Sequence, residues 1–205
     1  MKIINIKDAK TDFIVSELKK GKIFFVPTDT CYGILGNVKK STIDRIFNIK
    51  RRPRGKSLPL FVSKKWVYNF VESSANFKKL IRNFWPGALT ISVLPKSSKI
   101  NFLKIVTNNN GTIAVREPDF LFLNKIINKY GEPLTSTSAN ITKMDACYST
   151  EELVKQFIRR KFKPDYIIDS GRLPKRKSSS IIDSYTLDLI REGEITRHVV
   201  IKKIK

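Results

Sequence analysis

Short apolar segments alternate along this chain with segments whose apolar residues recur at helical spacing, and this alternation is the strongest constraint on the fold. The segments expected to form strands are residues 3–6, 23–26, 58–62, 89–94, 112–115, 134–137, 166–169, 180–183 and 187–190. The segments expected to form helices are one capped by Asp8, one that begins at Ser41, residues 76–84, residues 120–130 and one capped by Ser149 or Thr150. Strands that alternate with helices predict an α/β or α+β domain with a mixed sheet. Residues 28–36 are expected to form a loop, and neither helix nor strand is favoured for residues 66–71.

The chain has 205 residues, of which 41% are hydrophobic, so we expect one domain spanning residues 1–205 with a sizeable core. No apolar run approaches the roughly 18 residues of a transmembrane helix, and the N-terminus lacks the apolar segment of a signal peptide. Cys31 and Cys147 show neither metal-ligand spacing nor the spacing of a redox pair. These features predict a cytoplasmic protein with no membrane partner and no metal-ligating residues.

The formal net charge of +22 and the sequence pI of about 10.1 favour a polyanionic partner such as RNA. Lys, Ile and Asn are all abundant, however, and a general bias of composition would raise the number of lysines everywhere. Both interpretations of the charge stay open at this point.

Residues 50–60, Lys-Arg-Arg-Pro-Arg-Gly-Lys-Ser-Leu-Pro-Leu, place five cations within seven positions. Pro53 and Gly55 restrict this segment to a loop that can aim its cations at one point. Arginine binds phosphate oxygens in bidentate fashion and lysine acts as a point charge, so the loop predicts a site for a nucleotide triphosphate or an RNA backbone. The alternative is a solvated loop. Because the chain has no Walker-type loop and no Rossmann fingerprint, a nucleotide site would have to rely on side-chain cations.

Three further polar segments follow or end predicted strands. Residues 27–33, Pro-Thr-Asp-Thr-Cys-Tyr-Gly, lie at a strand's carboxyl end, where ligand sites of α/β proteins are common. In residues 112–118, Thr-Ile-Ala-Val-Arg-Glu-Pro, Arg116 can hold a carboxylate, or can pair with Glu117 or a surface acid. Residues 135–140, Thr-Ser-Thr-Ser-Ala-Asn, offer small donors. Taken singly, the segments rich in hydroxyls are equally well explained as turns or helix caps.

Together with residues 84–90, Phe-Trp-Pro-Gly-Ala-Leu-Thr, these segments resemble the threonylcarbamoyl-AMP synthases, the YrdC/Sua5 group. The resemblance runs from about residue 23 to residue 193. Each motif alone is weak, whereas five motifs in order are specific. The resemblance implies a twisted mixed sheet flanked by helices, a basic concave cavity, and the short, single-domain form of the family.

The resemblance further implies a nucleotidyltransferase that forms L-threonylcarbamoyladenylate and pyrophosphate from L-threonine, bicarbonate and ATP. ATP is then a substrate, accompanied by Mg²⁺. The product serves the N6-threonylcarbamoyladenosine modification of tRNA through downstream threonylcarbamoyl-transfer proteins, and tRNA is a candidate partner for the basic surface.

The resemblance also implies site residues. Those at ATP are Lys50, Arg52, Lys56, Thr112, Ser138, Asn140 and Arg191, with Lys50 and Arg52 as catalytic cations at the phosphates. Those at threonine are Thr30, Ser63, Arg116, Ser136 and Ser179. The implied chemistry is attack of a threonine carbamate on the α-phosphorus of ATP. The single histidine, His198, is expected to have a surface or packing role.

The chain departs from the family pattern at several places. Ser63 stands where many relatives carry histidine, Thr142-Lys143 where they carry Ser-Gly, and Ala146-Cys147-Tyr148 where they carry a Ser-Pro-Thr-like segment. Two alternatives to the synthase remain. One is a non-catalytic module that binds double-stranded RNA or tRNA, which predicts salt-dependent binding without adenylate formation. The other is a carbamoyl-adenylating domain of the hydrogenase-maturation type, which normally forms part of a longer chain.

Overall fold

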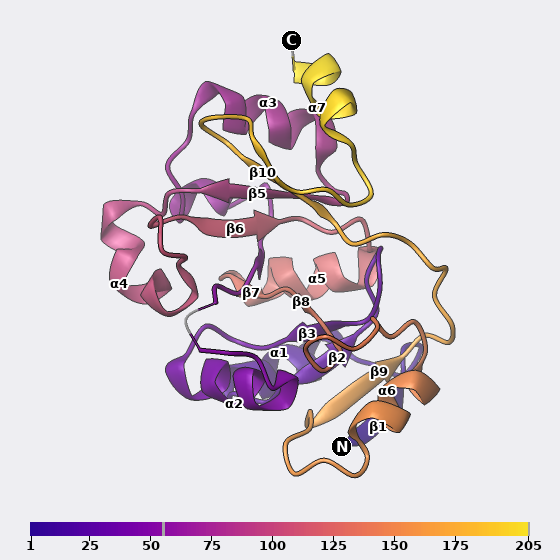
Figure 1. Ribbon diagram of the computed structural model, residues 1–205. Helices are drawn as coiled ribbons and strands as arrows, with labels where there is room; N and C mark the ends of the chain where they lie inside the picture. The colour runs from indigo at the N-terminus through magenta and orange to yellow at the C-terminus, as the bar shows by residue number, and fades with distance from the viewer. Residues whose placement is uncertain (55, 205) are drawn as a thin grey trace.

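The computed structural model describes residues 1–54 and 56–204, which form two mixed sheets with helices around them (Figure 1). In the first sheet the strand order is β1 (Lys2–Asn5), β9 (Tyr166–Asp169), β2 (Phe24–Val26), β3 (Gly33–Leu35) and β8 (Thr137–Ser138). In the second it is β11 (Leu189–Arg191), β10 (Ser180–Asp183), β5 (Leu89–Val93), β6 (Ile113–Arg116), β4 (Leu60–Phe61) and β7 (Leu134–Thr135). The α/β class is confirmed, with two sheets in place of one.

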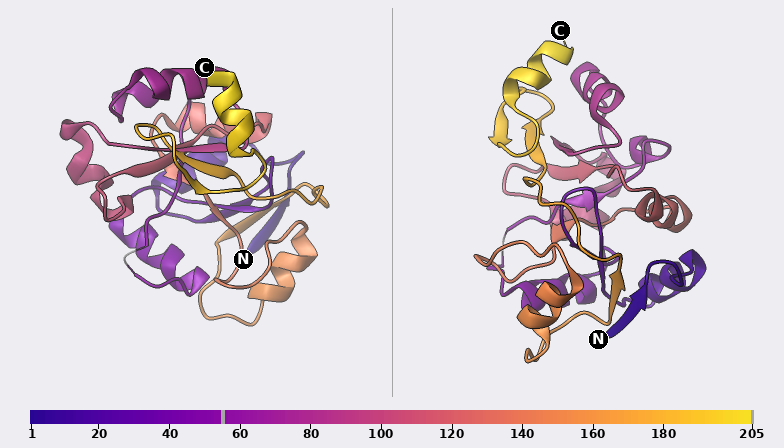
Figure 2. Two further views of the ribbon diagram at one scale, coloured as in Figure 1. Left: turned by 45° about the horizontal axis from the view of Figure 1, so that its top comes forward. Right: turned by 90° about the vertical axis from the view of Figure 1, so that its right-hand side faces the viewer.

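The helices are α1 (Thr11–Lys19), α2 (Lys40–Lys50), α3 (Ala75–Phe84), α4 (Ile100–Leu103), α5 (Leu121–Tyr130), α6 (Thr150–Phe157) and α7 (Arg197–Ile204). Helices α3 and α7 pack together at one end of the molecule, beyond the second sheet, and α2 and α6 lie at the other end (Figures 1 and 2). Helix α1 packs on α5. No helix within the described residues is both long and apolar enough to cross a bilayer.

Residues 134–138 pass from one sheet to the other. Leu134–Thr135 pairs with β4, whereas Thr137–Ser138 pairs with β3. Between the two short strands, the Ser136 N–H donates to the Pro59 carbonyl at 2.7 Å. The single strand expected over residues 134–137 is therefore wrong: the segment divides at Ser136, and its hydroxyls lie at the seam between the sheets.

Other local expectations also need correction. Residues 28–36 are not a continuous loop, because they contain strand β3, in which Ile34 and Leu35 pair with β2. The two apolar residues lie between glycines, which made the segment resemble a loop. Helix α1 has Lys10 at its N-cap position without a side-chain cap, so Asp8 does not cap it. Ser149 does cap α6, by accepting from the Glu152 N–H. Helices α4 and α7 were not expected, since each is short and buries few residues.

The basic loop, residues 50–60, begins with a tight turn at the end of α2. The Arg51 N–H donates to the Asn48 carbonyl at 3.2 Å, and the Arg52 N–H to the Phe47 carbonyl at 3.0 Å. These two bonds form a Schellman motif, in which the residue with left-handed backbone is usually glycine. Here it is Arg51, with φ of 49°. Gly55, expected to shape the same loop, lies outside the described residues.

We expect an Arg51→Gly variant to be more stable than the wild type. Glycine adopts the left-handed conformation without the Cβ clash, and the net gain after its larger loss of entropy is up to about 1 kcal/mol. This corresponds to a rise in Tm of roughly 2–4 °C for a chain of this size. Thermal unfolding of Arg51→Ala is the control, because alanine removes the charge but keeps the clash. Equal Tm values for the two variants would contradict the explanation.

Candidate functional site

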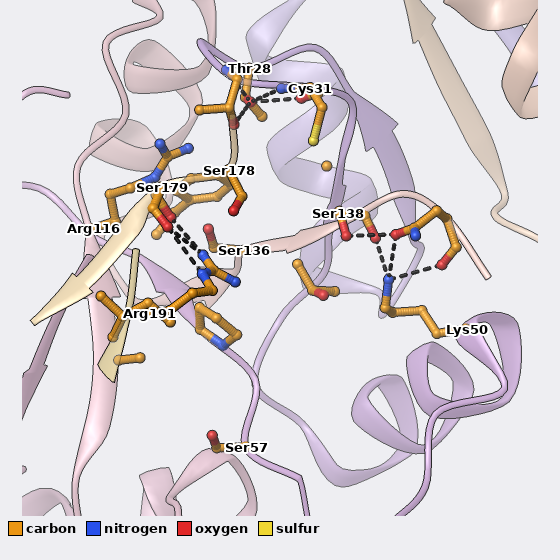
Figure 3. A pocket seen from close by; sticks show the side chains of 18 of the residues that line it. Thr28, Cys31, Lys50, Ser57, Arg116, Ser136, Ser138, Ser178, Ser179 and Arg191 are labelled. Atoms are coloured by element: carbon orange, nitrogen blue, oxygen red, sulfur yellow. Dashed lines mark hydrogen bonds between the residues drawn. The ribbon is translucent and has the colours of Figure 1, made fainter. Parts of the chain in front are cut away.

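A cavity of about 320 Å³ opens at the seam between the two sheets (Figure 3). Its walls come from the turn after β2, the end of α2, the basic loop, β4, β6, the segment from Ser136 to Lys143, and the residues around β10 and β11. The basic loop and all three polar segments expected at strand ends thus reach one cavity.

Most of the predicted site residues line this cavity. They are Thr30, Lys50, Arg52, Arg116, Ser136, Ser138, Asn140, Ser179 and Arg191. The remaining three, Lys56, Ser63 and Thr112, lie outside its lining.

Lys56 lines a neighbouring hollow together with Ser57 and the loop Asn108–Asn110. Arg52 and Ser57 line both spaces, so the hollow adjoins the main cavity. Thr112 is buried, and its hydroxyl lies 2.7 Å from that of Ser92 and accepts from the Asn108 amide at 2.7 Å. The Thr112 hydroxyl therefore has partners within the protein, and its contact with a nucleotide stays a prediction.

Ser63 is almost fully buried, and its hydroxyl lies 3.4 Å from Glu117 Oε1 as a donor. The Glu117 carboxylate also accepts from the Lys64 N–H at 3.3 Å, and burial raises its pKa. Ser63 thus faces this buried acid, and its predicted contact with threonine also remains a prediction.

The turn after β2 is held together by the Thr28 hydroxyl. This oxygen accepts from the Thr30 N–H at 3.1 Å and from the Cys31 N–H at 3.3 Å, and it donates to the Cys31 carbonyl at 2.7 Å. Gly33 leaves room for the Thr28 methyl group, which would lie 3.2 Å from a Cβ at that position. Thr28 was not singled out from the sequence, although a threonine directly after a strand is typical of such turns.

Arg116 forms a buried ion pair with Asp29. Its Nη2 and Nη1 donate to the two Asp29 carboxylate oxygens at 2.9 and 3.4 Å, and both side chains are at most 6% exposed. The guanidinium also lies over the Phe61 ring, 5.4 Å from its centroid. Asp29 belongs to the first sheet's β2–β3 turn and Arg116 to strand β6 of the second, so the pair joins the two walls. Two of the five guanidinium N–H groups are used, and others are available to a ligand.

Lys50, the last residue of α2, is 2% exposed. Its ammonium donates to the Ser138 carbonyl, to the Asn140 carbonyl at 2.9 Å and to Asn140 Oδ1 at 3.1 Å (Figure 3). These contacts use the three ammonium N–H groups and hold the turn that follows β8. Burial, and next the charge of Arg52, lower the pKa of Lys50 to about 8.

We expect this pKa to give the unfolding free energy a pH dependence that a Lys50→Met variant lacks. The ordinary pKa of the lysine is 10.5 and its folded value is about 8, so the unfolded state binds more protons between these values. The contribution of Lys50 to stability is complete above pH 10.5 and is lost as the pH falls to 8. From pH 8 to 10.5 the unfolding free energy of the wild type should rise by up to about 3 kcal/mol relative to that of Lys50→Met. Urea unfolding at several pH values measures both.

The difference between the two proteins is the quantity that tests this expectation, because it cancels the other groups that titrate in alkali. A difference that stays constant across the range would contradict the lowered pKa of Lys50.

Two arginines bring further positive charge to the cavity. Arg52 donates from Nη2 to the Ser57 carbonyl at 2.9 Å, while its buried Nε has no hydrogen-bond partner among the described residues. Arg191 donates from Nη2 to the Ser179 carbonyl at 2.6 Å (Figure 3). Burial, followed by the charge of Arg116, lowers the pKa of Arg191. Cations that converge in this way, without a carboxylate among the described lining residues, are suited to bind an anionic ligand.

The same residues do not fit a magnesium ion held by the protein. Among the described residues no three His, Cys, Asp or Glu side chains lie close enough together to form a metal site. Asp29 lies next to the cavity, but its carboxylate already accepts from Arg116 and from the Asp119 N–H at 3.1 Å. Magnesium prefers oxygen ligands, and here these would have to come from the ligand itself.

Several lining residues were not assigned from the sequence. They are Thr28, Cys31, Gly33, Ser57, Pro59, Phe61, Ala114, Thr137, Thr142, Lys143, Ser178 and Ile181. Some of them directly adjoin assigned residues, as Ser57 adjoins Lys56 and Ser178 adjoins Ser179. Their position at the end of a polar motif is the signal that could have identified them.

The Sua5/YciO/YrdC family model, described as telomere recombination, matches residues 16–193. A putative threonylcarbamoyl-AMP synthase of Methanocaldococcus jannaschii is 35% identical over 190 residues, which cover 90% of this chain and 86% of that protein. The threonylcarbamoyl-AMP synthase of Vibrio vulnificus is 32% identical over 186 residues, which cover 88% and 96%.

Solved structures show the same similarity. Pyrococcus abyssi Sua5 complexed with L-threonine has a TM-score of 0.86 at 26% identity; the match covers 100% of this chain but only 61% of that one. Escherichia coli YciO has a TM-score of 0.78 at 22% identity, with 94% of each chain covered, and shares the fold. A full-length HypF also shares it, with a TM-score of 0.69 at 16% identity over 85% of this chain and 27% of that one. From the family model and the relatives together, this chain belongs to the Sua5/YciO/YrdC family.

Proposed function

We propose that this protein is an L-threonylcarbamoyladenylate synthase, which makes threonylcarbamoyl-AMP and pyrophosphate from L-threonine, bicarbonate and ATP. The observation that carries the proposal is the convergence in one cavity of Arg116, Arg52 and Arg191 with a row of hydroxyl groups. The names of the relatives, and the L-threonine complex of the similar Sua5 structure, support it.

At the threonine end, we propose that Arg116 binds the substrate carboxylate. Its guanidinium is held in one orientation by Asp29 and Phe61, so little side-chain freedom is lost on binding. Thr30, Ser136 and Ser179 carry hydroxyls in the same lining and would bind the polar groups of threonine. Ser63 lies outside the cavity lining and would support threonine binding from the layer of residues beneath these hydroxyls.

At the ATP end, we propose that Arg52 and Arg191 bind phosphate oxygens. The unpaired Nε of Arg52 is a donor that such an oxygen would satisfy. Ser138 and Asn140 line this part of the cavity on the turn that Lys50 holds. The role of Lys50 as a catalytic cation at the phosphates stays a prediction, because its ammonium has three acceptors within the protein. Lys56 and Thr112 would contribute from the adjoining hollow. Mg²⁺ would enter as part of the substrate, bound to the phosphates of ATP.

In the proposed reaction bicarbonate loses hydroxide to give carbon dioxide, and the amine of threonine bonds to its carbon. An amine proton leaves with the hydroxide as water, so a carbamate forms. A carbamate oxygen attacks the α-phosphorus of ATP, and the bond from that phosphorus to the bridging oxygen breaks, so pyrophosphate leaves. The protein contributes by positioning the two substrates and by neutralising charge with fixed cations. Burial raises the pKa of Cys31, which disfavours the thiolate form, and the proposed reaction uses no cysteine nucleophile.

The decisive assay measures pyrophosphate release from ATP with threonine and bicarbonate, each omitted in turn, and identifies the adenylate by mass spectrometry. Release that requires both co-substrates supports the proposal. Release with carbamoyl phosphate in place of them would indicate the hydrogenase-maturation type of reaction. If no adenylate forms while RNA binds in a salt-dependent manner, the non-catalytic alternative holds.

We further propose that the adenylate passes to downstream threonylcarbamoyl-transfer proteins for the modification of tRNA in the cytoplasm. The charge of +22 supports contact with tRNA at the surface.

A further inference from the structure

Lys143 occupies an unusual place in the cavity wall. The Met144 N–H donates to the Ile141 carbonyl at 2.9 Å, so Thr142 and Lys143 are the central residues of a β-turn. Lys143 has φ of 73°, the left-handed conformation for which this turn position normally selects glycine. Lys143 also lines the main cavity.

No contact within the protein accounts for the lysine at this position. Lys143 is exposed, and its ammonium has neither a hydrogen-bond partner nor an ion-pair partner in residues 1–54 and 56–204. A residue other than glycine that is held in the left-handed conformation at a ligand cavity points to a function in binding, since this backbone conformation is unfavourable for a residue with a Cβ.

The turn is also fixed relative to the other cations. The Thr142 N–H donates to the Lys50 backbone carbonyl at 2.8 Å, and the Asn140 side-chain amide donates to the Met144 carbonyl at 2.5 Å. The ammonium of Lys50 holds Asn140 from the other side. Lys143 therefore starts from a rigid turn that is attached to the last residue of α2, directly before the basic loop.

We infer that Lys143 is an additional phosphate-binding residue, which reaches the polyphosphate of ATP from this turn. The inference rests on the proposed function for the choice of ligand. The chemistry that it requires is a polyanion in the cavity, and a lysine ammonium binds such a ligand as a mobile point charge.

Three variants test the inference by calorimetric titration with ATP, pyrophosphate and L-threonine, each alone. Lys143→Gly removes both the charge and the strain, Lys143→Asn removes the charge but tolerates the conformation, and Lys143→Arg keeps the charge. We expect Gly and Asn to lower the affinity for ATP and pyrophosphate about tenfold and to leave threonine binding unchanged. Arg should bind ATP as the wild type does, and Gly should raise the Tm.

Arg51→Gly is the matched control. It also replaces with glycine a cationic residue whose backbone is left-handed, but this residue lies outside the cavity lining. It should raise the Tm and leave ATP affinity unchanged. The inference is overturned if Lys143→Gly binds ATP as tightly as the wild type, or if it loses affinity for ATP and threonine alike.

The design separates this inference from the proposed reaction. ATP binding is measured without turnover, so a Lys143-dependent affinity would stand even if the wild type formed no adenylate. Conversely, adenylate formation by the wild type together with unchanged ATP binding by Lys143→Gly would leave the reaction intact and remove Lys143 from it.

Discussion

An Arg52→Ala variant should release pyrophosphate at least about 100-fold more slowly than the wild type in the presence of ATP, threonine and bicarbonate. If Arg52 binds the phosphates as proposed, the developing charge there loses this cation, and no neighbouring arginine of the loop can replace it from the same backbone position. The variant should remain folded, because Arg52 makes one side-chain hydrogen bond, to Ser57, and its buried Nε is unpaired.

Arg54→Ala is the matched control for this measurement. Arg54 belongs to the same basic loop, but its side chain is largely exposed and pairs with Asp44 on α2. Removal of either arginine lowers the net charge equally, so an effect of overall charge would slow both variants to the same extent. Turnover of Arg52→Ala at the wild-type rate would remove Arg52 from the site.

An Asp29→Ala variant should lose about 3–5 kcal/mol of unfolding free energy. The change leaves the Arg116 guanidinium buried without its anionic partner, and it also leaves the Asp119 N–H without an acceptor. Urea unfolding at neutral pH measures the loss.

The double variant Asp29→Ala/Arg116→Met separates this effect from simple loss of contacts. Methionine restores an apolar side chain over Phe61, so no charge is left uncompensated. We expect the double variant to be more stable than Asp29→Ala alone. A double variant that is less stable by the sum of both single changes would show that the two side chains act independently.

Apolar periodicity predicted most strands and the longer helices. Each of these helices buries one face, and many of the strands are buried along their length. It failed where an element is short and takes its stability from pairing or packing with other elements. Strand β3 exists through pairing with β2 and β8, and helix α7 through packing on α3. Neither relation leaves a local pattern.

The cavity was predictable as a set of motifs but not as a set of contacts. Nothing in the sequence indicates that Arg116 pairs with Asp29 rather than with Glu117, or that Lys50 holds the turn after β8. The same is true of Ser63 and Thr112, whose hydroxyls have partners within the protein. The sequence shows the departure Thr142-Lys143, whereas the left-handed backbone of Lys143 is a property of the folded turn that the sequence does not indicate.

The change of sheet at Ser136 has a consequence for how this part of the chain can evolve. Thr135 is in register with Leu60, and two residues later Thr137 is in register with Ile34. An insertion or deletion between them would put one of the two ladders out of phase and would carry the acceptors of Lys50 away from α2. The length of the segment is therefore fixed from both ends, whereas exchange of the cavity-lining side chains Ser136 and Ser138 would change ligand preference without a change of register.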